Sequence, residues 1–169
     1  MYDLQELMNI LYVDVETVSN QPDLASLEKT DPAMAALWRD RCIYLRRRFV
    51  DTAGMTDELL YQEKAGLQAE FAKIVCISVG LIKTDGSVQV LSYASDDERD
   101  LMAKFLLLVK NYFKSAGAGG TICGHNIKRF DIPMICKRAC ILHVDLPDPL
   151  NRIHKLKPWE MPFQDTAEV

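Results

Sequence analysis

The hydrophobic and polar positions along this chain change their period several times, and each change predicts a secondary-structure element. Short apolar runs rich in β-branched residues are typical of strands. Such runs occupy residues 9–15, 74–82, 88–93 and 121–124, and residues 163–165 begin a further one. Asp85 and Gly86 lie between the second and third runs and form a hairpin signal. The sequence therefore predicts five strands, two of them joined by a tight turn.

Apolar residues at helical spacing lie between the later strands. Asp96 or Asp97 is expected to begin a helix that continues to about residue 114, where a glycine-rich segment follows. Asn126 or Ile127 is expected to begin a second helix that continues to about residue 140. These helices alternate with strands, which predicts that they pack on a sheet.

Roughly 50 residues separate the first strand from the second, far more than a usual connection. Asp31 before Pro32 is typical of a helix start, and Thr56 begins a shorter helix that ends near Gly66. The first of these helices carries an apolar face, formed by Met34, Leu37, Trp38, Cys42, Leu45 and Phe49. We therefore expect a folded helical insertion over about residues 20–70, with Leu37, Trp38, Leu45 and Phe49 buried.

The order of elements predicts an α/β fold, a mixed sheet flanked by helices, with the helical insertion between strands 1 and 2. The length of 169 residues fits one domain over residues 1–169, and 49% hydrophobic residues are ordinary for a globular protein. No apolar run approaches the ~20 residues of a membrane span, and the N-terminus lacks the features of a secretory signal. Five cysteines, an odd number, indicate reduced thiols and a cytoplasmic location.

Two carboxylates, Asp14 and Glu16, follow the first apolar run. Residues i and i+2 of a strand point to the same face, so these carboxylates project side by side and repel unless a cation lies between them. Hard cations such as Mg²⁺ or Mn²⁺ prefer such oxygen ligands. Asp131 is a third candidate acid. Taken alone, Asp14 and Glu16 are more often solvated acids at a strand end, and Asp131 is an ordinary acid in the first turn of a helix.

Two motifs carry a resemblance to a known family. The segments DVET at residues 14–17 and NIKRFD at residues 126–131 resemble the first two motifs of the four-carboxylate (DEDD) 3′–5′ exonucleases, which have the ribonuclease H-like fold. The subgroup they resemble contains predicted exonucleases related to the proofreading domain of family B DNA polymerases. Residues 70–77 and 164–166 also resemble strand regions of that subgroup, so the resemblance spans residues 10–166.

The resemblance implies roles for individual residues. Asp14, Glu16 and Asp131 would be the catalytic metal ligands of a site for two Mg²⁺ or Mn²⁺ ions, with Asp14 bridging them. Thr17 would lie close to the terminal nucleotide of the substrate, and Asn126 and Phe130 are the other candidate substrate-binding residues, although Phe130 is expected mainly to pack. The implied substrate is the 3′ end of single-stranded DNA or RNA.

The third motif of that family, Tyr-x-x-x-Asp or His-x-x-x-x-Asp on a later helix, has no good match. Tyr93 with Asp97 precedes the second motif, and His143 with Asp148 lies in a proline-containing segment that cannot form a helix interior. Asp165 is expected to be a structural acid. We therefore interpret the chain as a C-terminally incomplete exonuclease domain that is weakly active or inactive.

Other features leave alternatives open. A net charge of −4 argues against a protein that coats nucleic acid. It does not exclude a nuclease, because bound metal ions supply the positive charge at an acidic nuclease site. The insertion contains five clustered arginines: Arg39, Arg41, Arg46, Arg47 and Arg48. We expect them to form a solvated helix face, and the alternative is a phosphate-binding surface. Cys136, Cys140 and His143 are too few for a closed zinc site. The alternative function is a catalytically degenerate nucleic-acid-binding or polymerase-associated module.

Overall fold

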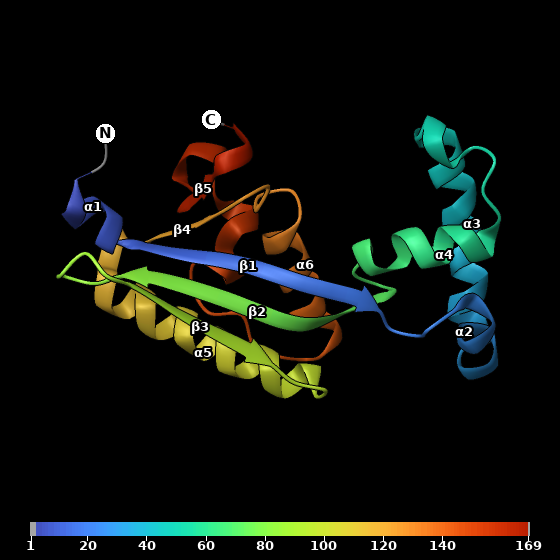
Figure 1. Ribbon diagram of the computed structural model, residues 1–169, viewed down its shortest axis with the longest axis horizontal. Coiled ribbons are helices and arrows are strands. Elements are labelled where there is room, and N and C mark those ends of the chain that lie inside the picture. The colour runs from blue at the N-terminus through green and yellow to red at the C-terminus, as the bar shows by residue number, and fades with distance from the viewer. Residues whose placement is uncertain (1–2, 169) are drawn as a thin grey trace. The chain divides into compact units, whose positions relative to one another are not determined.

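The computed structural model describes residues 3–168 (Figure 1). The chain divides into two compact units. The sheet unit comprises residues 1–16 and 74–169, and the helical unit comprises residues 17–73. That these units form a single domain stays a prediction.

The sheet has five strands, and their order is β3-β2-β1-β4-β5. The strands are β1 (Ile10–Ser19), β2 (Ala72–Ile82), β3 (Val88–Ala94), β4 (Thr121–Gly124) and β5 (Phe163–Asp165). β2 and β3 are antiparallel, whereas β1 is parallel to β4 and β4 is parallel to β5. The α/β fold with a mixed sheet is therefore confirmed, and it is consistent with a ribonuclease H-like fold.

The turn between β2 and β3 is the expected hairpin. Gly86 has φ of 78°, a left-handed conformation that glycine adopts without strain, and its N–H donates to the carbonyl of Lys83 at 2.9 Å. Lys83 in turn donates its N–H to the carbonyl of Ser87. The turn thus sets the register in which Ile82 faces Val88.

Within residues 3–168, the α-helices of the sheet unit are α1 (Leu4–Met8), α5 (Glu98–Ala116) and α6 (Asp131–Ile141). Figure 1 shows α5 and α6 behind the strands β1 to β3. Asp97 caps α5 by accepting hydrogen bonds from the N–H groups of Arg99 and Asp100. The buried side of α5 consists of Leu101, Met102, Phe105, Leu106 and Val109. This apolar stripe is what holds the helix against the sheet.

The start of α6 was predicted wrongly. The helix begins at Asp131, not at Asn126 or Ile127, because residues 126–130 form a separate turn. In this turn the carbonyl of Asn126 accepts hydrogen bonds from the N–H groups of Arg129 and Phe130. Asp131 is therefore the first residue of the helix.

The helical unit contains α2 (Leu24–Thr30), α3 (Pro32–Arg48) and α4 (Asp57–Lys64). Asp31 caps α3 by accepting from the N–H of Met34, and Thr56 caps α4, as expected. The unit has its own apolar core, in which Trp38 makes edge contacts with the rings of Tyr61 and Phe71. That these helices are an insertion into a ribonuclease H-like domain stays a prediction.

Two residues of the predicted apolar face are not buried. Leu37 is 55% exposed and Phe49 is 46% exposed, whereas Trp38 and Leu45 are buried as expected. The buried stripe of α3 follows Ala35, Trp38, Cys42 and Leu45 at three- and four-residue steps. Leu37 lies off that stripe, and Phe49 lies beyond the last helical residue.

Short 3₁₀ helices complete the chain. They cover Val50–Thr52, Ala65–Leu67, Gly117–Gly119, Leu150–Lys155, Pro158–Glu160 and Thr166–Glu168. Within residues 3–168, no helix combines the length and the apolar character needed to cross a membrane.

Candidate active site on the central strands

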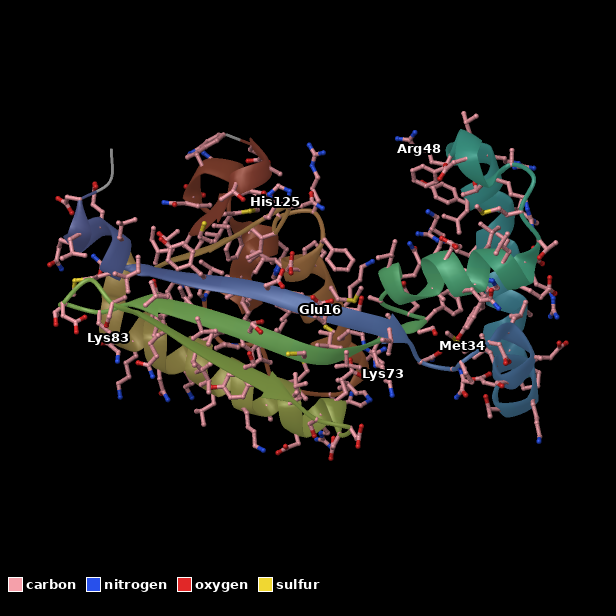
Figure 2. All side chains as sticks on the ribbon, viewed as in Figure 1. Glu16, Met34, Arg48, Lys73, Lys83 and His125 are labelled. Atoms are coloured by element: carbon pink, nitrogen blue, oxygen red, sulfur yellow. The ribbon has the colours of Figure 1, made fainter. Side chains whose placement is uncertain are left out.

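Asp14 and Glu16 lie on one face of β1, as the strand period predicted. Both are exposed, whereas the alternating Val13 and Val15 are only 5% and 6% exposed and point into the core. Figure 2 shows Glu16 on β1, within the sheet unit. The strand therefore presents two carboxylates to solvent beside a buried apolar row.

Asp131 is held beside the same segment of β1. It is the first residue of α6 and only 4% exposed, and its Oδ1 accepts a hydrogen bond from the backbone N–H of Val15 at 3.1 Å. Val15 lies between Asp14 and Glu16, so this contact joins the two sequence motifs across 116 residues. A carboxylate at a helix N-terminus is also favoured by the helix dipole.

The electrostatics of Asp131 are unfavourable for a carboxylate. Its pKa is raised to about 6, chiefly by burial and also by the negative charges of Asp14 and Asp165, while its own backbone N–H and that of Val15 act in the opposite direction. Asp14 is therefore close enough to Asp131 for their charges to interact. A raised carboxylate pKa beside a second acid is typical of functional sites and of cation sites.

Three-ligand metal sites are absent from the described part of the chain. Within residues 3–168, no group of three His, Cys, Asp or Glu side chains is close enough to hold an ion. Asp14 and Asp131 are close enough for their charges to interact, and Glu16 lies on the same strand face as Asp14. Mg²⁺ is commonly bound by only one or two protein carboxylates together with waters and substrate phosphates, so the donor set fits a hard cation. The three-residue ligand set stays a prediction.

Asp165 has a structural role, as expected. It lies at the end of β5, and its carboxylate accepts backbone N–H groups from Asn126 at 2.7 Å, Lys128 at 3.1 Å and Ala167 at 3.0 Å. Burial opposes ionisation of Asp165, but these donors and the charge of Lys128 outweigh it and lower its pKa. Asp165 thereby holds the 126–130 turn that leads into Asp131.

Gly124 permits the close approach of the two motifs. A Cβ at this position would lie 2.6 Å from the carbonyl oxygen of Val13 and 2.9 Å from Cδ1 of Ile127. Since both distances are shorter than real Cβ contacts, only glycine fits where β4 passes β1. The carbonyl concerned belongs to the residue before Asp14.

A groove of about 520 Å³ lies on the sheet unit beside Asp14. Its lining includes Tyr12, Gly80 and His125, and the Nδ1 of His125 lies 3.1 Å from Oγ1 of Thr166. Figure 2 shows His125 just beyond β4. Tyr12 and His125 were not predicted as site residues. The available signals were the position of Tyr12, two residues before Asp14, and of His125, directly before Asn126.

The predicted substrate-binding residues occupy different environments. Thr17 belongs to the helical unit, where its hydroxyl donates to the carbonyl of Gly66 at 2.7 Å. Asn126 has φ of 57°, and Phe130 is half-buried directly before α6. Their contacts with a nucleotide stay a prediction.

The acids of the two segments whose spacing resembles a third motif, Asp97 and Asp148, have other hydrogen-bond or ion-pair partners. Asp97 caps α5, and Asp148 forms an exposed ion pair with Arg152 at 3.0 Å. Cys136 has a pKa raised to about 12 by burial, which disfavours the thiolate that zinc requires. That the chain lacks a third-motif acid and a zinc site stays a prediction.

Comparisons with known proteins give limited similarity. No protein-family model matches the chain, and no curated protein matches it. A solved structure of the family B DNA polymerase from the hyperthermophilic archaeon Pyrobaculum calidifontis is similar at 18% identity and a TM-score of 0.48. The match covers 95% of this chain but 15% of the polymerase chain. The part matched is therefore a small share of a much longer polypeptide.

Proposed function

We propose that the protein is a metal-dependent 3′–5′ exonuclease that hydrolyses phosphodiester bonds of DNA or RNA from the 3′ end. The observation that carries the proposal is the hydrogen bond from the Val15 N–H to Asp131, which holds a buried carboxylate beside Asp14. This contact joins the two exonuclease-like motifs and keeps the Asp131 carboxylate buried, whereas an ordinary surface acid would be solvated.

Asp14, Glu16 and Asp131 are the residues that would hold Mg²⁺ or Mn²⁺. When bound, such ions lower the pKa of a ligated water and neutralise charge that develops on the phosphate. The chain's own contribution is positioning. Val15 fixes the orientation of the Asp131 carboxylate, and burial of that carboxylate excludes competing water.

The groove next to Asp14 provides room for a terminal nucleotide. It combines an aromatic ring from Tyr12 with the imidazole of His125, which suits contact with a base or sugar on one side and a phosphate on the other. Asn126 and Phe130 belong to the turn that follows His125, and Thr17 follows Glu16 on the chain. We include these three as substrate contacts on the strength of the sequence resemblance.

The proposal is tested by metal binding and by product analysis with the same protein. We expect the protein to bind Mn²⁺, measured by electron paramagnetic resonance, and to shorten a 5′-labelled single strand stepwise from its 3′ end. The rate is expected to be low because Asp97 and Asp148 are engaged elsewhere. Asp14→Asn and Asp131→Asn should abolish both properties, whereas the charge-matched change Asp100→Asn on the exposed side of α5 should preserve them.

Three results would overturn the proposal. The first is cleavage within the strand, which indicates an endonuclease. The second is equal activity in the Asp14→Asn and Asp100→Asn proteins, which indicates a contaminating nuclease. The third is nucleic-acid binding without Mn²⁺ binding or cleavage, which indicates the catalytically degenerate binding module.

A further inference from the structure

The outer side of α3 carries an exposed row of arginine and aromatic residues. Arg41, Tyr44 and Arg48 recur at steps of three and four residues, so they lie along one face of the helix, beside its buried stripe; Arg41 is half-exposed. Tyr44 is 49% exposed, a high value for an aromatic ring in a folded unit. Figure 2 shows Arg48 at the C-terminal end of α3.

Two of the aromatic rings are paired with guanidinium groups. The Cζ of Arg41 lies 4.8 Å from the centroid of the Tyr44 ring, and the Cζ of Arg48 lies 5.6 Å from the centroid of the Phe49 ring. Arg41 is held in place because its Nε also donates to Oε1 of Gln68 at 3.0 Å. Each pair therefore places a positive charge over one face of an exposed ring and leaves the ring's edge and other face for a base.

The arginines of α3 fall into two groups. Arg39 pairs with Glu28, and Arg46 pairs with Asp57 and also donates to the carbonyl of Met55. These two arginines have structural partners within the helical unit. By contrast, within residues 3–168 no carboxylate forms an ion pair with the exposed Arg47 and Arg48 or with the half-exposed Arg41, whose hydrogen-bond partner is the neutral Gln68.

We propose that Arg41, Tyr44, Arg47, Arg48 and Phe49, here called the α3 surface, bind single-stranded nucleic acid. The exposed rings of Tyr44 and Phe49 would stack on unpaired bases, and the guanidinium groups would pair with the backbone phosphates. Three uncompensated positive charges match phosphates, although the whole chain carries a net charge of −4. Duplex nucleic acid fits less well because its bases are already stacked.

A protein partner is the less favoured occupant. A protein interface would remove three guanidinium groups without ion-pair partners from water. The free energy of that desolvation exceeds the free energy gained by the contact unless the partner supplies matching carboxylates. Phosphates supply that compensation at every nucleotide. Asp40 is the exposed acid nearest in sequence on this side of α3, four residues before Tyr44, and it weakens the field without neutralising all three charges.

The surface goes beyond the proposed exonuclease activity, because binding here needs neither Asp14 nor Asp131. Its test uses the full 169-residue protein in EDTA, so that nothing is cleaved. We would measure fluorescence anisotropy with fluorescein-labelled 20-nucleotide oligothymidylate and oligouridylate at several salt concentrations. In Arg47→Gln/Arg48→Gln we expect about tenfold weaker binding at low salt, with the log-affinity against log-salt slope reduced by about 1.4 for two lost charges.

The matched control removes the same charge from another surface. Lys110→Gln/Lys114→Gln lies on exposed positions of α5 and should leave affinity and salt slope unchanged. Arg47→Lys/Arg48→Lys should retain the slope. Circular dichroism confirms that each variant is folded.

A second pair of variants isolates stacking from charge. Tyr44→Ala should weaken binding roughly fivefold or more without changing the salt slope, because it removes a ring and no charge. Tyr44→Phe should bind like the wild type, since the ring is kept. Asp100→Asn, an exposed acid on α5, should bind like the wild type. Because binding is measured in EDTA, failure of exonuclease activity and failure of the α3 surface give different results.

Two outcomes would overturn the inference. If Arg47→Gln/Arg48→Gln binds the oligonucleotides with wild-type affinity, the α3 surface does not bind nucleic acid, and a protein partner becomes the favoured occupant. If the protein binds a 20-base-pair duplex and the single strand equally well, and Tyr44→Ala does not change the affinity, binding at the α3 surface is nonspecific charge attraction without base stacking.

Discussion

The buried carboxylate of Asp131 accepts a hydrogen bond from the backbone N–H of Val15 at 3.1 Å. This contact attaches the first residue of α6 to β1 between Asp14 and Glu16. Burial and the nearby negative charge of Asp14 make the ionised form of Asp131 unfavourable. An ionised Asp131 therefore lowers the free energy of unfolding. Such a cost is expected where a residue is kept for function.

Asp131→Asn is predicted to stabilise the metal-free protein at pH 8. The asparagine oxygen still accepts from Val15, but the buried charge is gone. The wild-type pKa is raised from 3.8 to about 6, so the wild-type protein is most stable, relative to this variant, below about pH 4 and loses that stability as the pH rises through 6. The difference between these two pKa values limits the stability gained by the variant to roughly 3 kcal/mol in the free energy of unfolding.

The measurement is urea unfolding in EDTA at pH 4 and pH 8. The gain from Asp131→Asn should be present at pH 8 and small at pH 4, and exonuclease activity should be lost in the same protein. Asp100→Asn, an exposed acid on α5, serves as the control and should show no such pH dependence. A variant that is less stable than the wild type at pH 8 would contradict the assignment.

Gly124→Ala is predicted to destabilise the sheet unit. The new Cβ would lie 2.6 Å from the carbonyl oxygen of Val13, so either β1 or β4 must shift. Overpacking of this kind costs about 1–3 kcal/mol or more. The shift would also displace Asp14, so the affinity for Mn²⁺ should fall. Thermal unfolding and Mn²⁺ titration measure the two effects.

Gly54→Ala is the matched control for that substitution. A Cβ at Gly54 meets nothing within 4 Å, and the change should alter stability by less than about 0.5 kcal/mol. Similar losses in both variants would show that backbone flexibility, and not the contact with Val13, is the cause.

Arg138 and Glu98 form a buried ion pair between α6 and α5, and the prediction is that breaking it is costly. Arg138 Nε donates to Glu98 Oε1 at 2.8 Å, and the same oxygen accepts the backbone N–H of Ile74 at 2.8 Å. Arg138→Met leaves the Glu98 charge buried and should cost about 3–5 kcal/mol in urea unfolding. Adding Glu98→Gln should recover part of this, because the buried charge is removed while an acceptor for Ile74 remains.

An exposed ion pair provides the contrast. Arg39 and Glu28 lie 3.0 Å apart on the surface of the helical unit, and Glu28→Gln should cost less than about 1 kcal/mol. If Arg138→Met costs no more than Glu28→Gln, the buried pair does not hold α6 in place.

Much of the fold was predictable because it depends on local signals. Alternation placed Asp14 and Glu16 on one strand face, Asp31 and Asp97 capped the expected helices, and Gly86 formed the hairpin. These features depend on residues a few positions apart, so one sequence contains them in full.

The remaining features depend on contacts between distant residues. The start of α6 was misplaced because Asp165, at the far end of the chain, captures the N–H groups of Asn126 and Lys128. Leu37 was expected to be buried, but the phase of α3 is set by Trp38 packing on Phe71. Tyr12 and His125 were not identified as groove residues, since the pairing of β1 with β4 joins segments that are far apart in the sequence.

Asn126 allows the backbone and side-chain contributions of the second motif to be separated. Its φ of 57° is left-handed, a conformation that asparagine and glycine tolerate and that costs alanine roughly 1–2 kcal/mol. Asn126→Gly is therefore predicted to leave the melting temperature nearly unchanged, whereas Asn126→Ala should lower it. Differential scanning calorimetry measures this difference. If the amide contacts the terminal nucleotide, Asn126→Gly should retain Mn²⁺ binding but raise the KM for a single-stranded substrate several-fold. A wild-type KM in the glycine variant would restrict Asn126 to shaping the turn that Asp165 holds ahead of Asp131.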